Sequence, residues 1–121
     1  MSWRKVSPAP TCQFGRYGAE VVVRYVYAGE ACDIRLPGII WFGLLSSVRA
    51  GRIVRLSETW TPWLASGGRA RQRAGYVELG YGYLFNREER IPDSVWEQIT
   101  AAMRSGGLEH LPSVDAAELE A

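Results

Sequence analysis

The sequence has little of what most catalytic and metal sites require. Among its 121 residues are one histidine, His110, and two cysteines, Cys12 and Cys32. A nucleophile activated by histidine would have to meet that single base, and no two Cys or His residues have the close spacing of a metal site. Neither a GxGxxG nor a Walker A phosphate loop occurs. We therefore expect no catalytic residue, no metal ligand and no cofactor.

Long apolar runs are also missing. No stretch approaches the roughly 20 apolar residues that span a bilayer, and Met1–Lys5 is not followed by the apolar segment of a secretory signal. Two cysteines do not make a disulfide framework. The default expectation is one domain in the cytoplasm, with two free thiols and no membrane contact.

Charge is unevenly distributed along the chain. Residues 1–87 hold 12 of the 14 basic residues and 5 of the 13 acidic ones, which gives +7. Residues 88–121 hold 2 basic and 8 acidic residues, which gives −6. Two interpretations stay open: the acidic end offsets the basic body within the molecule, or a basic face is left for an acidic partner.

Alternation of apolar and polar residues predicts several strands. Glu20–Tyr27 and Ala31–Leu36 alternate well and flank a short turn at Gly29, so they predict a first hairpin. Tyr76–Phe85 alternates again and predicts a later strand. Between this strand and the helix that follows, Asn86–Arg90 is expected to be a charged connector.

Gly38–Trp60 is expected to be the central hairpin, with its turn at Ala50-Gly51, because glycine supplies the positive φ of tight turns. The ingoing arm has an alternative. Ile39–Val48 also fits a short buried helix, and periodicity alone does not decide between the two.

A helix is predicted for Ser94–Ser105. Ser94 and Glu97 form a capping-box pair, and Gly106-Gly107 ends the helix. Its expected apolar stripe consists of Val95, Ile99, Ala102 and Met103.

The predicted fold class is α+β, with about five mostly antiparallel strands in a curved sheet that is covered by one C-terminal amphipathic helix. A small half-open barrel with the helix as a plug is the second possibility. Residues 1–17 are expected to be an extended arm, residues 18–111 the domain, and residues 112–121 an acidic tail. We detect no internal repeat in the sequence.

Residues 65–75 are rich in glycine and arginine and lack core-forming side chains, so a mobile loop is expected there. Three guanidiniums in such a loop would suit an acidic partner. The candidate partner-binding residues are Arg69, Arg71, Arg73, Trp63, Arg52 and Arg55.

A pocket is the other candidate site. On the expected return strand Glu58 shares a face with Leu56 and Trp60, and a partly buried carboxylate of this kind suits a general base. An edge position or a pairing with a cross-strand arginine is the plainer interpretation. The candidate pocket residues are Glu58, Trp60, Tyr81 and Tyr83.

Three classes of function remain. The first is a small, non-enzymatic cytoplasmic protein that occupies and inhibits a macromolecular partner, as bacterial immunity proteins and phage anti-CRISPR inhibitors do. Its partner would be a protein or nucleoprotein with an acidic surface. The alternatives are a nucleic-acid-binding module that uses the basic body and the arginine loop, and a small-molecule pocket protein or enzyme centred on Glu58. The oligomeric state is open, and a homodimer is compatible with the sequence.

Overall fold

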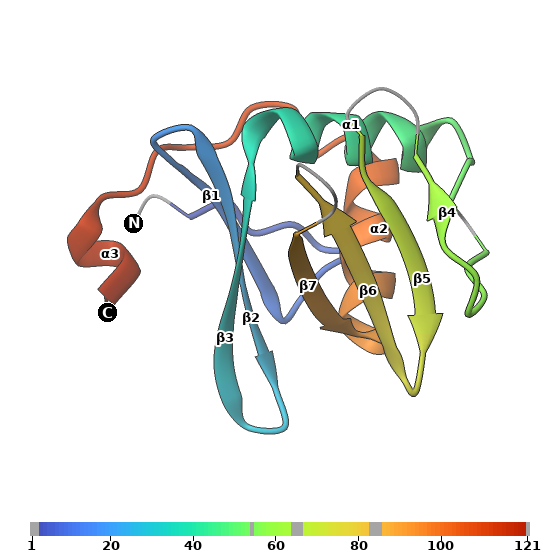
Figure 1. The fold of residues 1–121 in the computed structure, drawn as a ribbon. Helices are drawn as coiled ribbons and strands as arrows, with labels where there is room; N and C mark the ends of the chain where they lie inside the picture. The colour runs from blue at the N-terminus through green and yellow to red at the C-terminus, as the bar shows by residue number, and fades with distance from the viewer. Residues whose placement is uncertain (1–2, 54, 64–66, 83–85, 121) are drawn as a thin grey trace.

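The computed structural model combines two antiparallel sheets with helices (Figure 1). It describes residues 3–53, 55–63, 67–82 and 86–120. The three-stranded sheet consists, in order, of β1 (Cys12–Tyr17), β2 (Glu20–Tyr27) and β3 (Glu30–Pro37). The four-stranded sheet consists of β4 (Thr61–Pro62), β5 (Arg69–Arg73), β6 (Tyr76–Tyr81) and β7 (Arg87–Pro92). The helices of the described residues are α1 (Gly38–Arg49), α2 (Asp93–Ser105) and α3 (Ala116–Glu120).

The predicted α+β class with antiparallel strands is confirmed, but the single curved sheet of about five strands is wrong. The strands form two separate sheets, so the half-open barrel is wrong as well. Helices α1 and α2 contact each other, and α2 also contacts strands of both sheets. One apolar core fills the space between the sheets and these two helices.

Strands β2 and β3 form the predicted first hairpin. Val21 and Val23 on β2 are buried, as are Ile34 and Leu36 on β3, because alternate residues of a strand share one face. β1 pairs with the other edge of β2. Part of the segment that we expected as an extended arm therefore belongs to the sheet.

Residues 38–49 form a helix, so the long hairpin predicted for Gly38–Trp60 is wrong and its helical alternative is confirmed. The helix begins after the N-cap residue Pro37, and Phe42 on its outer side is 55% exposed. The buried apolar residues recur at helical spacing, which places them on one face. They are Ile40, Trp41, Leu44, Leu45 and Val48.

Two strands replace elements that we expected to be irregular. Arg69–Arg73 is strand β5 and not a mobile loop, and Arg87–Pro92 is strand β7, which includes most of the expected connector. Neither segment has the apolar alternation of a typical strand. Both pair with β6, whose inner residues Val77 and Leu79 are almost fully buried. Burial of the central strand therefore determines the structure of its neighbours.

Helix α2 confirms the predicted C-terminal helix and its apolar stripe, which is buried. It ends at Gly106, whose φ of 86° is the left-handed conformation of a helix C-cap. The capping box is wrong, because Pro92 is the N-cap and no side chain caps the helix. Ser94 lies inside the first turn.

The chain contains an internal repeat, contrary to our sequence analysis. The N-terminal unit consists of β1, β2, β3 and α1, and the C-terminal unit of β5, β6, β7 and α2. Each unit is a three-stranded meander followed by an N-cap proline, with φ and ψ of −52° and 144° in one and −55° and 142° in the other. Between residues 37–51 and 92–106, four identical residues recur at a spacing of 55 positions: Pro37 and Pro92, Trp41 and Trp96, Arg49 and Arg104, and Gly51 and Gly106.

The segment that follows each helix crosses to the other unit. After α1, the Ser57 carbonyl accepts a hydrogen bond of 2.8 Å from the Gln72 amide of β5. After α2, the Pro112 carbonyl accepts a hydrogen bond of 2.8 Å from the Arg16 amide of β1. The two accepting residues are again 55 positions apart. The units are thus joined by two equivalent crossings, as the subunits of a swapped dimer are.

Candidate docking face

The outer face of the four-stranded sheet gathers arginines and aromatic rings. On β6, Val77 and Leu79 point toward the core, so Tyr76, Glu78 and Gly80 point outward. The antiparallel register fixes which outward residues of β5 and β7 lie beside them. We call this surface the arginine face; its residues are Trp60, Arg69, Arg71, Arg73, Tyr76, Glu78 and Arg90.

Glu78 lies at the centre of the arginine face and is only 4% exposed. The Arg71 Nε donates to one carboxylate oxygen at 2.7 Å. The other oxygen accepts a hydrogen bond from Arg73 Nη2 at 3.3 Å and lies 3.4 Å from Arg90 Nε. Three guanidiniums thus share one carboxylate, which leaves a positive excess of two charges.

The same geometry sets the protonation of Glu78. The hydrogen bond from Arg71, together with the positive charge of Arg73, holds the pKa of the Glu78 carboxyl below its ordinary value, against the opposing effect of burial. Glu78 is therefore ionised wherever the protein is folded near neutral pH, and it aligns the surrounding guanidiniums.

The aromatic rings of the arginine face are covered by guanidiniums. The guanidinium carbons of Arg69 and Arg71 lie 4.4 and 4.3 Å from the Trp60 ring centroid, and that of Arg90 lies 4.3 Å from the Tyr76 ring. Such cation–π contacts favour fixed orientations of the charged groups. The guanidiniums are consequently held in place before any partner arrives.

The equivalent outer face of the N-terminal unit is covered by the chain itself. Val22 is fully buried there in a small apolar cluster with Val114 and Leu119, against which Trp3 packs. The Arg24 guanidinium pairs with Asp33 at 2.8 Å and donates to the backbone carbonyls of Glu118 and Leu119. The cover is residues 113–120, which hold three acidic and no basic residues. Figure 1 shows α3 lying on the outer side of the three-stranded sheet.

No described helix covers the arginine face in the same way. In Figure 1, α2 lies behind the four-stranded sheet, on its core side. The side chains of Arg73 and Arg90 are 50% and 55% exposed. The outer faces of the two units thus differ: the first is covered by an acidic segment, and the second presents arginines.

The predicted partner-binding residues are only partly brought together. Arg69, Arg71 and Arg73 share the arginine face, although on a strand and not on a loop. Arg52 and Arg55 are exposed elsewhere. Trp63 is 2% exposed and packs against the backbone at Gly68, so it belongs to the core.

The predicted pocket residues do not form one site. Glu58 is exposed, whereas Trp60 lies under the guanidiniums of the arginine face. Tyr81 is buried, and its hydroxyl donates to the Arg35 carbonyl at 3.4 Å. Tyr83 lies outside the described residues.

Tyr76, Glu78 and Arg90 were not predicted from the sequence as members of the arginine face. One signal in the sequence could have indicated this face: arginine occupies every second position from Arg69 to Arg73, which places all three arginines on one side of a strand. Without β5 recognised as a strand, its pairing with Glu78 could not be inferred.

No described group of three or more His, Cys, Asp or Glu could hold a metal ion, and no described helix is long and apolar enough to cross a membrane. Cys12 is buried, and burial raises the pKa of its thiol. In comparisons with known proteins, no protein-family model, no curated protein and no solved structure matches this chain.

Proposed function

We propose that the protein is a non-enzymatic binding protein that takes up an acidic segment of a partner protein on the arginine face. The observation that carries this proposal is the contrast between the two units. The outer face of the N-terminal unit is occupied by the acidic segment 113–120, and on its counterpart, the arginine face, no described helix takes that place. An equivalent segment from another chain would satisfy the excess guanidinium charge.

The contacts of α3 indicate what such a segment needs. An apolar side chain packs on the sheet, as Leu119 does on Val22. Backbone carbonyls accept hydrogen bonds from a guanidinium, as those of Glu118 and Leu119 do from Arg24. Carboxylates then pair with the outer arginines, which is the strongest of the available contacts because both groups are charged.

A protein partner is favoured over nucleic acid by the state of the aromatic rings. Proteins that bind single strands stack bases on exposed aromatic faces. On the arginine face, Trp60 and Tyr76 already hold guanidiniums over their rings. Because these rings are already covered, nucleic acid is the second candidate ligand.

Occupation of the partner is also the proposed mode of action. A small binding protein can act on a partner by covering a surface, which would inhibit a partner whose active surface is acidic. We extend the proposal to such inhibition, in the manner of immunity proteins.

The experiment uses a defined probe, a synthetic peptide of residues 113–121, and measures its binding in trans by fluorescence anisotropy. We expect binding that weakens as salt is added, because exposed charges are screened. The double variant Arg73→Ala/Arg90→Ala should raise the dissociation constant about tenfold, the loss expected for contacts worth about 1.4 kcal/mol. The matched control is Arg35→Ala/Arg52→Ala, which removes two exposed arginines away from the arginine face.

Two further probes separate the alternatives. A peptide in which Asn and Gln replace Asp and Glu should bind much more weakly. A random single-stranded DNA of 20 nucleotides should bind feebly at physiological salt. Tight DNA binding with a steep dependence on salt, lost in Arg73→Ala/Arg90→Ala, would instead support the nucleic-acid alternative.

A further inference from the structure

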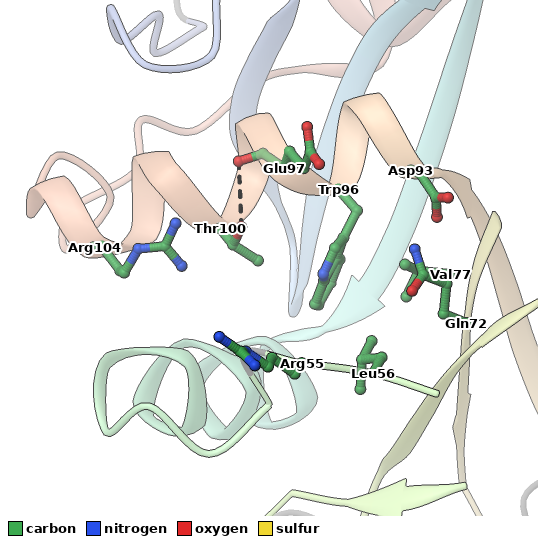
Figure 2. A pocket seen from close by; sticks show the side chains of 9 residues that line it. All are labelled: Arg55, Leu56, Gln72, Val77, Asp93, Trp96, Glu97, Thr100 and Arg104. Atoms are coloured by element: carbon green, nitrogen blue, oxygen red, sulfur yellow. Dashed lines mark hydrogen bonds between the residues drawn. The ribbon is translucent and has the colours of Figure 1, made fainter. Parts of the chain in front are cut away.

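A cavity of about 470 Å³ lies on the other side of the four-stranded sheet (Figure 2). It is bounded by α2, by Gln72 and Val77 of β5 and β6, and by Arg55 and Leu56 of the segment that follows α1. Gln72 alternates with the arginines of β5, so this cavity does not open onto the arginine face. We call it the α2 cleft.

The α2 cleft recurs in the other unit and is therefore a product of the repeated fold. A second cavity of about 710 Å³ is lined by Trp41 of α1, by the strand pair Arg16 and Val21, and by Leu111 of the segment after α2. The corresponding lining of the α2 cleft is Trp96, the strand pair Gln72 and Val77, and Leu56. A tryptophan, a cross-strand pair and a crossing segment thus form a cleft twice.

The two clefts differ in the groups that the helices contribute. Asp93 and Glu97 line the α2 cleft, and the residues 55 positions earlier, Gly38 and Phe42, line the second cavity. The helix therefore contributes two carboxylates to the α2 cleft and none to the second cavity, whose charged lining residues, among them Arg16, Glu20 and Glu109, come from other segments. Such a difference indicates a specific polar ligand for the α2 cleft.

The polar groups of the α2 cleft are arranged from one end to the other. Figure 2 shows the guanidiniums of Arg55 and Arg104 at one end, the Trp96 ring in the middle, and Asp93 with Gln72 at the far end. Within the described part of the chain, neither arginine forms an ion pair with a carboxylate. Two guanidiniums at one end of a cavity favour an anionic group between them.

Asp93 gives an independent indication at the other end. Its Oδ1 atom is buried and accepts no hydrogen bond from any described residue. A buried carboxylate oxygen without a donor is unfavourable, so a donor supplied by a ligand would remove the penalty. The Asp93 carboxylate is therefore suited to a protonated amine.

The spacing of these groups limits the length of the ligand. Asp93 and Thr100, which lines the cleft beside Arg104, are seven residues apart on α2 and so about 10 Å apart along its axis. An extended peptide of three residues spans about 10 Å. A single amino acid is too short to reach both ends.

We propose that the α2 cleft binds a short zwitterionic peptide of about three residues, with its carboxylate between Arg55 and Arg104 and its amino group at Asp93. An apolar side chain of the peptide then packs on the Trp96 ring. This site is independent of the arginine face, and it would hold a small ligand while a partner protein is bound on the other side of the sheet.

The test measures binding of the tripeptide Ala-Leu-Ala to the full chain by calorimetry and by thermal shift. We expect measurable binding that weakens at least tenfold when the amino group is acetylated, and likewise when the carboxylate is amidated. Inorganic phosphate alone should bind more weakly than the tripeptide, because it occupies only the arginine end. Equal binding of the free and the doubly blocked tripeptide would overturn the proposal, as would no binding of either.

Variants distinguish the cleft from other surfaces. Asp93→Asn should abolish the preference for a free amino group, and Arg104→Gln should abolish the preference for a free carboxylate. Each variant should bind the free tripeptide at least tenfold more weakly than the wild type does. The matched control is His110→Gln, which changes the residue of the second cavity that corresponds to Arg55. Thermal melts of the free variants establish that each is folded. A folded Asp93→Asn variant that still discriminates the acetylated tripeptide would overturn the assignment of the amino group to Asp93.

Discussion

Trp3 and Trp60 occupy corresponding positions on the outer faces of the two sheets. Each precedes a backbone pairing with the first strand of its unit, Arg4 with Phe14 in one case and Thr61 with Ala70 in the other. Trp3 packs with the acidic C-terminal segment, whereas Trp60 lies under two arginines. The repeat therefore allows a comparison, within one chain, of a face that a described helix covers with one that no described helix covers.

The repeat predicts that corresponding core residues contribute similarly to the free energy of unfolding. Leu44 on α1 and Ile99 on α2 are 55 positions apart, and both are buried, at 1% and 2% exposure. Leu44→Ala and Ile99→Ala should each lower the free energy of unfolding by about 2–4 kcal/mol, through lost burial and the cavity left behind. Phe42→Ala is the control, because Phe42 is 55% exposed and its loss should cost less than about 0.5 kcal/mol. Denaturant melts measure the free energy of unfolding of all three variants. A small effect of Leu44→Ala would contradict the placement of α1 in the core.

Much of this core was predictable, and the reasons are local. Helix α2 and the β2–β3 hairpin follow from regular apolar patterns that their burial enforces. Helix α1 was ambiguous because apolar residues also lie on its exposed side, as Ile39 and Phe42 do. The two faces of the helix therefore differ too little in hydrophobicity for the sequence pattern to exclude a strand.

The arginine face and the repeat could not be predicted for a different reason. Strand β5 has no apolar alternation of its own, since Ala70 is its single fully buried side chain. It becomes a strand through its pairing with β6, which is a tertiary effect. The repeat retains little identity in the strands, and its helices match through spacing and only a few shared residues such as Trp41 and Trp96.

Glu78 should make stability depend on pH. Because its pKa is lower in the folded protein than the ordinary value of about 4.3, the ionised carboxylate stabilises the fold above that value. This contribution is lost as pH falls through the lower, folded pKa. Glu78→Gln should therefore cost about 1–3 kcal/mol at pH 7, since it replaces the buried, ionised acceptor of three guanidiniums with a weaker, neutral one. The difference from wild type should shrink below about pH 4.

Urea melts of both proteins between pH 7 and pH 3 measure this effect. Glu88→Gln is the control, because Glu88 is an exposed carboxylate on the neighbouring strand β7. A Glu78→Gln variant with a deficit that is constant across this range would contradict the lowered pKa as its cause.

Residues 113–120, which cover the outer face of the N-terminal unit, should be destabilised by a mutation that leaves the main core intact. Leu119 is 9% exposed and belongs to the small cluster with Val22, apart from the main core. Leu119→Ala should cost about 1–2 kcal/mol, less than a central core truncation, because the short α3 lies at the edge of the molecule. Hydrogen exchange should quicken at the amides of Val114 and Leu119, which donate to Arg16 and Asp115. Unchanged exchange at both amides would show that α3 does not depend on this cluster.

The most direct test of the account is to map where an acidic segment binds. Isotope-labelled protein is titrated with the peptide of residues 113–121, and the amide resonances of both units are followed. The account predicts saturable shifts on β5 and β6, centred on Arg71 and Glu78, which are absent in Arg73→Ala/Arg90→Ala and retained in Arg35→Ala/Arg52→Ala. Shifts confined to β1, β2 and β3, or an unchanged response in Arg73→Ala/Arg90→Ala, would contradict the assignment of the arginine face as the docking site.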